Sequence, residues 1–404
     1  MATQVDDARY DTSSAPTKPP FWRDPRARAL IVQGVFLAVV LGTIFWLINN
    51  TMSAMERQGI ASGFGFLNSE AGFSISQTLI SYDQTNTYGR VFIVGLLNTL
   101  LVSACGIVLA TILGFIIGIA RLSDNWLISR LAAVYVEIFR NIPLLLQIFF
   151  WYFAVLRQLP QPRDMLERGQ VVTTFSLNNR GLYVPKPLFG DGIEWVGLAF
   201  VAALVGIYVL RRVARAKQMA TGKQMAILWP SLGMLIGLPL ITYLLAGVSL
   251  TFDYPEMGGF RLDGGLLIIP EFVALLVALS VYTASFIAEI VRAGILAVNR
   301  GQTEAAFALG LRPGPTLRLI IVPQAMRVII PPLTSQYLNL TKNSSLAAAV
   351  AYPDLVSQFA GTVLNQTGQA IEVMAMTLAV YLTLSLTISF FMNWYNARSA
   401  LVER

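Results

Sequence analysis

The stretch that decides the fold is Gly301–Pro332, which reads GQTEAAFALGLRPGPTLRLIIVPQAMRVIIPP and lies between two long apolar runs. It contains alanines, glycines and prolines as well as Arg312, Arg318 and Arg327, and Arg300 comes directly before it. A segment this polar between two candidate membrane spans must form a loop that connects them.

We expect this loop to be folded. Gln302–Leu311 is rich in strong helix formers, and Glu304 places a carboxylate in the first turn, where it suits the helix dipole. Gly310 suits a helix C-terminus, and the residue before a proline avoids the α region. The sequence therefore predicts a helix that ends near Gly310, a second short helix opened by Pro315, and interruptions at Pro323 and Pro331-Pro332.

The predicted loop helix carries a carboxylate within one turn of small side chains, which let another backbone approach closely. A helix packed only on its own domain needs no more than this. The series Glu304-Ala305-Ala306 followed by Gly310 nevertheless resembles the EAA loop of bacterial ABC-importer permeases, which plugs into a groove on the ATPase subunit. This resemblance implies an ATPase-coupling loop made of Gln302, Glu304, Ala305, Ala306, Gly310 and Leu311.

The resemblance extends through Leu317–Pro332 to Lys342–Leu346, and this longer pattern resembles the polar amino-acid branch of the family. The inserted spans within residues 157–270 resemble general L-amino-acid permease membrane subunits. The resemblance implies that the chain translocates L-amino acids, polar or broad range, across the inner membrane.

Composition identifies a membrane protein. The 404 residues are 55% hydrophobic and 13% charged, and several apolar runs approach the 20 residues that a bilayer span needs. The chain has no histidine and a single cysteine, Cys105, which excludes an intramolecular disulfide and a Cys-based metal site. The net charge of +7 comes from arginines near span ends, so orientation and lipid contact explain it better than nucleic acid.

Eight apolar runs predict an all-α integral membrane protein with about eight transmembrane helices. They are Ala29–Ile48, Val91–Ala120, Leu131–Leu156, Trp195–Leu210, Ala226–Val248, Glu271–Ile295, Val328–Leu340 and Val373–Trp394. The first run is too long for a signal-peptide core and should remain as an anchor. The resemblance implies a type I ABC importer core of five helices, with an N-terminal helix and an inserted helix pair as additions.

This organisation divides the chain into four parts. We expect a cytoplasmic N-terminal tail (1–28), an extra first helix with a periplasmic loop (29–90), the permease domain (91–396) with its insertion (157–270), and a cytoplasmic C-terminal tail (397–404). Nineteen Lys and Arg residues lie in the tails and loops on the side of the termini, against eight in the opposite loops. This bias predicts that both termini and Gly301–Pro332 are cytoplasmic, in a multi-pass protein of the bacterial cell inner membrane.

Two groups of residues suit helix packing. Gly106, Ala110, Gly114 and Gly118 recur every four residues and form a ridge along one helix face, which allows close packing in lipid. Asn98 and Thr99 suit interhelical hydrogen bonds better than ligand binding.

Charged residues near spans are costly unless they are paired or functional. Glu137 and Arg140 are three apart and can pair on one helix face, as can Glu289 and Arg292. The first pair, with Asn141 and Pro143, also resembles a segment of the family's core, which makes it a candidate gate in the translocation pathway.

Lys342 allows two interpretations. Its ammonium group can snorkel to a headgroup, or Asn343, Ser344 and Ser345 can interrupt the helix so that Lys342 lines a cavity.

The chain lacks the Gly-x4-Gly-Lys-Ser/Thr loop that cradles nucleotide phosphates. The resemblance therefore implies no catalytic activity and no cofactor or metal on this chain, with ATP and Mg on a partner ABC ATPase. It also implies a periplasmic amino-acid-binding protein and a second homologous permease subunit, besides membrane lipid and without nucleic acid. An ion-coupled secondary transporter is the alternative, but it would be expected to show mid-span carboxylates and internal repeats.

Overall fold

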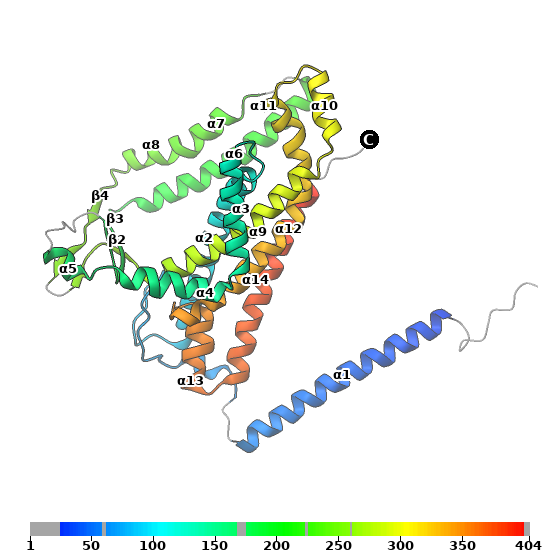
Figure 1. Ribbon diagram of the computed structural model, residues 1–404. Coiled ribbons are helices and arrows are strands. Elements are labelled where there is room, and N and C mark those ends of the chain that lie inside the picture. Colours follow the sequence, from blue (N-terminus) through cyan, green and yellow to red (C-terminus); the bar gives the residue numbers. More distant parts are fainter. Residues whose placement is uncertain (1–24, 59–61, 168–174, 223–224, 259–260, 400–404) are drawn as a thin grey trace, which may run out of the picture. The chain divides into compact units, whose positions relative to one another are not determined.

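The computed structural model describes the chain except for residues 1–24, 59–61, 168–174, 223–224, 259–260 and 400–404 (Figure 1). Most of the expected N-terminal tail and the last residues of the C-terminal tail lie outside the described residues. The chain divides into two compact units. One comprises Met1–Phe64 with Thr367–Glu372, and the other comprises Gly65–Gln366 with Val373–Arg404.

The first unit is dominated by one long helix, α1 (Pro25–Gln58). Its segment Arg28–Thr51 has 24 residues with a mean hydropathy of 2.4, and no residue of its most apolar window is buried. The helix is therefore long and apolar enough to cross a membrane. The predicted run Ala29–Ile48 lies inside it.

The second unit holds the remaining elements. Its first half contains η2 (Phe64–Asn68, which begins at the unit boundary), α2 (Tyr88–Ala120), α3 (Trp126–Asn141), α4 (Leu144–Phe149), η3 (Phe150–Val155), η4 (Leu156–Gln158), α5 (Pro162–Glu167), β1 (Ser176–Asn178), β2 (Gly181–Val184), β3 (Lys186–Phe189), α6 (Ile193–Thr221), α7 (Leu228–Leu232), η5 (Gly233–Gly237) and α8 (Leu238–Leu245). Its second half contains β4 (Leu250–Asp253), β5 (Glu256–Gly258), β6 (Arg261–Asp263), β7 (Leu266–Ile268), α9 (Pro270–Leu296), α10 (Arg300–Ala308), α11 (Pro313–Thr316), η6 (Leu317–Ile321), α12 (Val322–Asn343), η7 (Ser344–Val350), η8 (Val356–Val363), α13 (Leu364–Thr367) and α14 (Ala370–Ser399, whose first turn belongs to the first unit).

The contact between α2 and α9 forms the centre of the second unit. The ridge residues Gly106, Ala110, Gly114 and Gly118 are all buried. A Cβ atom at Gly114 would lie 2.5 Å from Ile287 Cγ2 of α9, and one at Gly118 would lie 2.7 Å from the Ala288 carbonyl oxygen. The two backbones therefore approach each other more closely than any side chain larger than glycine would permit at these positions.

The predicted span Leu131–Leu156 is not one continuous helix, because α3 and the helix that follows it are bent by 105°. The bend occurs at Ile142-Pro143, where both residues adopt extended conformations (ψ 126° and 135°). A residue before proline avoids the α region, which explains the break. The Gln147 side-chain amide donates to the carbonyl oxygens of Phe139 (3.0 Å) and Ile142 (2.9 Å) and so satisfies acceptors near the break.

The long helix α12 also differs from expectation. Pro331 and Pro332 lie inside it without ending it, whereas the sequence predicted an interruption. The helix is preceded by the π-helical turn η6, and Thr334 Oγ1 donates to the Ile330 carbonyl oxygen at 3.3 Å beside the prolines. The prolines lack the N–H groups that would bond to the Arg327 and Val328 carbonyl oxygens, so the helix continues through them without two of its backbone hydrogen bonds. The predicted seventh span, Val328–Leu340, is therefore the middle of a longer helical segment, Pro313–Val350.

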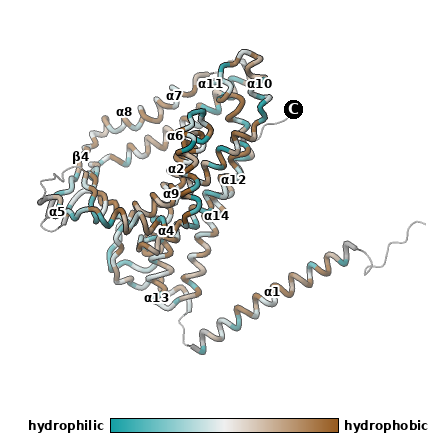
Figure 2. The backbone as a smooth tube through the Cα atoms, viewed as in Figure 1, coloured by the Kyte–Doolittle hydropathy of each residue, from teal (hydrophilic) through white to brown (hydrophobic). Residues whose placement is uncertain are grey.

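The insertion contains strands as well as the expected helix pair. Helix α6 runs on beyond Leu210, the end of the predicted span, as far as Thr221, and it packs beside α8. At one end of this pair, the two connecting loops pair with each other as the sheets β1-β2-β7 and β3-β4, and β5 pairs with β6. Figure 1 shows the strands at the opposite end of α6 from α10 and α11, and Figure 2 shows the apolar residues along α6 and α8.

Seven helices in the described residues are long and apolar enough to cross a membrane, and the bent pair α3–α4 would make eight. The predicted number of about eight is thus reached when the bent pair is included.

Candidate functional site

The loop between α9 and α12 is built around α10, which has well-defined caps. At its start, Asn299 Oδ1 accepts a hydrogen bond from the Gly301 N–H at 2.8 Å. At its end, the Gly310 N–H donates to the Phe307 carbonyl oxygen (2.9 Å) and the Leu311 N–H to that of Ala306 (3.0 Å). These two bonds, with Gly310 at φ +76°, form a Schellman motif, for which the left-handed conformation favours glycine.

The helix boundaries correct two details of the prediction. Helix α10 begins at Arg300, two residues before the expected start, because Asn299 supplies the cap. The second short helix, α11, begins at Pro313, because Arg312 is extended and Pro313 takes the first helical position. Pro315 lies inside α11 and does not open it.

Most side chains of the predicted coupling loop are exposed. Gln302, Glu304 and Ala305 are exposed, Leu311 is half-buried, and Ala306 is buried against the rest of the unit. The Gln324 side-chain amide of α12 donates to Gln302 Oε1 at 3.3 Å. One face of α10 is thus attached to the unit while the other faces outward.

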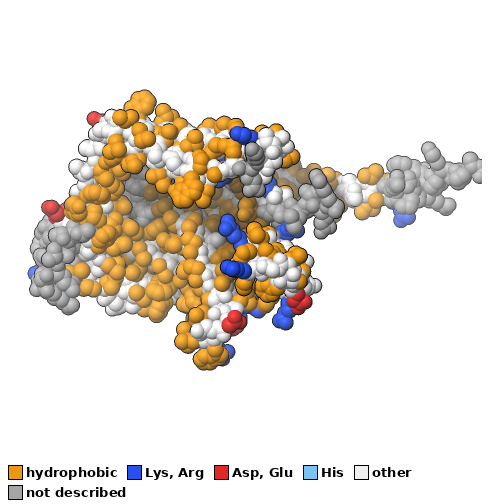
Figure 3. Space-filling model, turned by 90° about the horizontal axis from the view of Figure 1, so that it is seen from above, with side chains coloured by type: hydrophobic (Ala, Val, Ile, Leu, Met, Phe, Trp, Pro, Cys, Tyr) orange, Lys and Arg blue, Asp and Glu red, His pale blue; other side chains and the backbone are white. Residues whose placement is uncertain are grey.

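Two apolar residues on this outward surface were missed from the sequence. Phe307 is 48% exposed and Leu309 is 81% exposed. In the sequence they could have been recognised as large apolar side chains in a polar loop, next to the glycine that ends the helix. Figure 3, which looks onto the end of the unit that carries α10, shows this surface with exposed Lys and Arg side chains around apolar ones.

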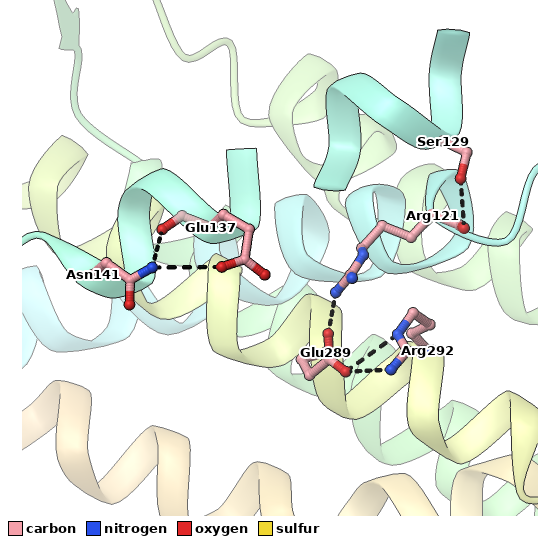
Figure 4. A network of polar contacts seen from close by, with 6 residues as sticks. All are labelled: Arg121, Ser129, Glu137, Asn141, Glu289 and Arg292. Carbon is pink, nitrogen blue, oxygen red and sulfur yellow. Dashed lines mark hydrogen bonds and ion pairs between the residues drawn. The ribbon is translucent and has the colours of Figure 1, made fainter. Parts of the chain in front are cut away.

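An ionic cluster fixes the base of the loop (Figure 4). Glu289 of α9 pairs with Arg292 at 2.5 Å and also with Arg121, which caps the end of α2. Ser129 of α3 donates to the Arg121 carbonyl oxygen at 3.0 Å. The i,i+3 pair was expected from the sequence, but Arg121 lies too far along the chain for spacing to reveal it.

The structure contradicts the predicted ion pair between Glu137 and Arg140. Among the described residues, neither side chain has an ion-pair partner within 4.0 Å. The Asn141 side-chain amide instead donates to the Glu137 backbone carbonyl oxygen at 2.7 Å and to its carboxylate at 3.5 Å (Figure 4). The Arg140 guanidinium lies 5.0 Å from the centre of the Phe286 ring, a cation–π distance. All three polar side chains are exposed on α3.

The segment around Lys342 lies where α12 tightens into the 3₁₀ helix η7. Lys342 is exposed, Asn343 and Ser345 are half-buried, and Ser344 is buried. Ser344 Oγ donates to the Thr341 carbonyl oxygen and Ser345 Oγ to that of Lys342. The serines therefore satisfy backbone acceptors at the change of helix type. The residue that follows η7, Ala351, is a non-glycine residue in the left-handed region at φ +57°.

A second polar cluster joins α2 to the start of η8, and its acidic member was not predicted. Asn98 Nδ2 donates to the carbonyl oxygens of Gln77 (2.9 Å) and Pro353 (2.8 Å). Thr99 Oγ1 accepts from the Leu355 N–H at 3.0 Å. Asp354 is fully buried, and its Oδ1 accepts from the Ser357 N–H at 2.8 Å. This carboxylate is therefore a helix N-cap, held against α2 by interhelical hydrogen bonds.

Burial raises the pKa of the Asp354 carboxyl from 3.8 to about 7, and the hydrogen bonds from the backbone oppose this shift only in part. Asp83, on an exposed turn, shows the opposite case. Hydrogen bonds from Thr85 and Asn86 lower the pKa of its carboxyl.

Within the described residues, no three or more His, Cys, Asp or Glu side chains gather as a metal site would require. The structure thus presents the outward helix α10 with its exposed apolar residues, the ionic cluster around Glu289 at the base of the loop, and polar side chains along α3 and at the junction of α12 and η7.

Comparisons with known proteins agree with these features. Residues 224–400 match the family model described as the inner membrane component of binding-protein-dependent transport systems. A putative amino-acid ABC transporter permease, YhdX of Escherichia coli K12, is 58% identical over 385 residues, which cover 94% of this chain and 96% of that protein. The general L-amino acid transport system permease AapQ of Rhizobium johnstonii is 54% identical, with 94% of each chain covered.

Among solved structures, an amino acid ABC transporter crystallised with histidines is 20% identical, with a TM-score of 0.45 and coverage of 77% of this chain and 95% of that one. The two near-full-length relatives show the family by themselves: the chain belongs to the binding-protein-dependent transport system inner membrane components and is an ABC-importer permease, a non-catalytic multi-span subunit whose ATPase activity lies on a separate subunit.

Proposed function

We propose that this permease carries L-amino acids, polar or broad range, across the bacterial inner membrane. The observation that carries the substrate class is the relationship, over 94% of the chain, to permeases named for amino-acid transport. The same relationship favours an ATP-driven importer over the ion-coupled alternative. On this proposal ATP and Mg bind to the partner ATPase, and no cofactor binds to this chain.

The loop helix α10 is the element proposed to couple the two subunits. Its exposed residues include Glu304, Ala305 and Phe307, and the Schellman motif at Gly310 ends the helix abruptly. A short outward helix with small residues and one exposed aromatic ring fits a groove on another protein, because the ring anchors while the small residues allow close approach. With the coupling loop docked, closure of the ATPases would move α10 as a lever.

The polar side chains of α3 and of the junction between α12 and η7 are the proposed translocation face. Charged groups within spans face a protein interior or water in preference to lipid. Glu137, Arg140 and Lys342 are exposed without ion-pair partners among the described residues, so a polar environment must be supplied from outside the chain. A second homologous permease subunit facing this surface would enclose a polar pathway. We propose that this pathway is lined by Glu137, Arg140, Asn141, Pro143, Lys342, Asn343, Ser344 and Ser345.

The orientation follows from the Lys and Arg bias: we propose that both termini and α10 are cytoplasmic. The opposite face of the chain would then receive substrate from a periplasmic amino-acid-binding protein.

The test is a tagged purification in mild detergent that compares wild type with Ala305→Arg and Gly310→Arg. Ala305 is exposed on α10, so its arginine variant changes the docking surface without burying a charge. We expect wild type to bring down an ATPase subunit and a second permease chain, and both variants to lose the ATPase while keeping the permease partner.

Met219→Arg is the matched control, because Met219 is 86% exposed near the end of α6 and lies outside the loop. It should retain both partners. Uptake of labelled amino acids by the reconstituted complex then tests the substrate class. Retention of the ATPase by both loop variants would refute the coupling role, and failure of any amino acid to be transported would refute the substrate class.

A further inference from the structure

The β3–β4 ribbon of the insertion has one entirely apolar face. The register pairs Lys186 with Asp253, Pro187 with Phe252, Leu188 with Thr251, and Phe189 with Leu250. Directly paired residues share a face and successive residues alternate between faces. One face therefore carries Pro187, Phe189, Leu250 and Phe252, and the other carries Lys186, Leu188, Thr251 and Asp253.

The apolar face is not covered by the described part of the chain. Phe189 is 50% exposed, Phe252 is 46% exposed and Leu250 is 41% exposed. The ribbon has two strands and no third strand pairs with either edge in the described residues. A lone two-stranded ribbon is marginal in water, so a cover for this face would stabilise it.

The position of the ribbon in the chain identifies that cover. Strand β3 ends at Phe189, shortly before α6 begins at Ile193, and β4 begins at Leu250, shortly after α8 ends at Leu245. Both helices belong to segments long and apolar enough to span a membrane. The backbone hydrogen bond from the Gly190 N–H to the Ser249 carbonyl oxygen (2.8 Å) extends the ladder toward the helix ends. The ribbon is thus tied to the membrane boundary through both of its strands.

Polarity along the ribbon agrees with this position. The pair nearest the helices is Phe189 with Leu250, and the pair farthest from them is Lys186 with Asp253. At about 3.4 Å per residue these pairs are roughly 10 Å apart, so the ribbon is long enough to span one headgroup layer, which is about 5–8 Å thick. Trp195, which is 60% exposed, lies in the first turn of α6 at the same boundary, where tryptophan is enriched in membrane proteins.

We propose that the β3–β4 ribbon is an interfacial anchor whose apolar face lies in the lipid headgroup layer where α6 begins and α8 ends. The unpaired strand edges fix its depth. Hydrocarbon tolerates no open sheet edge, whereas the headgroup layer contains water that can satisfy the free backbone groups. The anchor would hold the inserted helix pair at a defined height and tilt.

Spin labelling tests the proposal, because the chain has a single cysteine. In a Cys105→Ala background, nitroxide labels are attached at Phe252→Cys and at Thr251→Cys in the assembled importer. The complex is reconstituted in vesicles of phosphatidylethanolamine and phosphatidylglycerol. Collision with oxygen, which concentrates in lipid, is compared with collision with a water-soluble nickel chelate.

Comparing the labels at 251 and 252 distinguishes two effects: which face of the ribbon is turned to lipid, and how deep each residue lies in the membrane. Thr251 is one residue nearer to α8 than Phe252, so height alone would place a label at 251 deeper in the membrane. We expect the opposite result, with an oxygen-to-nickel ratio several-fold higher at 252. The Pro187→Cys and Leu188→Cys variants repeat the test on the other strand, because Pro187 lies on the apolar face but is one residue farther from α6 than Leu188, so the test remains decisive if one variant fails to fold.

Three results would overturn the proposal. A ratio equal at 251 and 252, or higher at 251, would show that the apolar face is not turned to lipid. Free access of the nickel chelate to 252 would show that the face lies in water. Exclusion of both reagents from 252 alone would show that a protein covers it.

Discussion

The contact between α2 and α9 predicts a measurable cost for a single added methyl group. In Gly118→Ala, the new Cβ would lie 2.7 Å from the Ala288 carbonyl oxygen and 2.8 Å from Val291 Cβ. Ordinary carbon contacts are about 3.5–4.0 Å, so one helix must move by roughly half an ångström or more. A backbone oxygen cannot rotate away as a side chain can, so the strain must be shared by the two helices.

Two opposing effects set the change in stability that Gly118→Ala should cause. Overpacking a close contact costs about 1–3 kcal/mol, and replacing glycine by alanine inside a helix returns up to about 1 kcal/mol. We therefore expect Gly118→Ala to lose about 1–2 kcal/mol of stability, a drop of roughly 1–2 °C in apparent melting temperature for a chain of 404 residues.

Gly197→Ala is the matched control. Gly197 lies in the exposed face of α6, and an added Cβ would meet nothing within 4 Å. The same change of residue should there leave stability unchanged or raise it. The assay is the fraction of monodisperse protein after heating in detergent, followed by size-exclusion chromatography. If Gly118→Ala melted at or above the temperature of Gly197→Ala, the close α2–α9 packing would be refuted.

Three further predictions follow from single contacts. Gly310→Val should destabilise α10 by about 1–2 kcal/mol because of the left-handed backbone, whereas Gly310→Asn should retain most of its hydrogen-exchange protection; equal protection in both variants would contradict this. Thr99→Val leaves the Leu355 N–H without its acceptor and should cost about 1–3 kcal/mol, seen as a lower melting temperature and refuted by an unchanged one. Burial raises the pKa of Asp354 from 3.8 to about 7, so its contribution to stability is greatest below pH 3.8 and is lost as the pH rises to about 7. Asp354→Asn keeps the cap and should melt with less pH dependence than wild type over that range; parallel pH profiles would contradict the shift.

The sequence predicted best what depends on local chemistry. Gly310 was placed at a helix end because few other residues adopt φ +76° there, and the apolar runs identified the helices long enough to cross a membrane because bilayer thickness sets their length. The ridge from Gly106 to Gly118 pointed to close packing, although its partner helix could not be named from spacing alone.

What the sequence missed depends on partners far along the chain. Arg121 and Glu289 are 168 residues apart and meet only because α2 and α9 pack together. The strands β2 and β7 come from two different loops of the insertion, and each is too short to give a periodic signal by itself. Pro331 and Pro332 were expected to interrupt a helix because proline removes a backbone donor, but α12 continues through both of them.

The same long-range contacts would allow the proposed coupling loop to act as a lever. A lever needs a stiff base, and both helices that flank α10 have one. A Cβ at Gly294 of α9 would lie 2.3 Å from Ile329 Cγ1 of α12, so these two helices are in close contact near the loop. Glu289, paired with Arg121, then ties α9 to the end of α2. On the proposed function, a force on α10 must displace α9 and α12 together and carry α2 with them, because the tight contacts leave little room for sliding. The bend at Pro143, by contrast, gives α4 a direction different from that of α3. On the proposed function, the polar face of α3 can therefore change its surroundings while the contacts among α2, α9 and α12 stay formed.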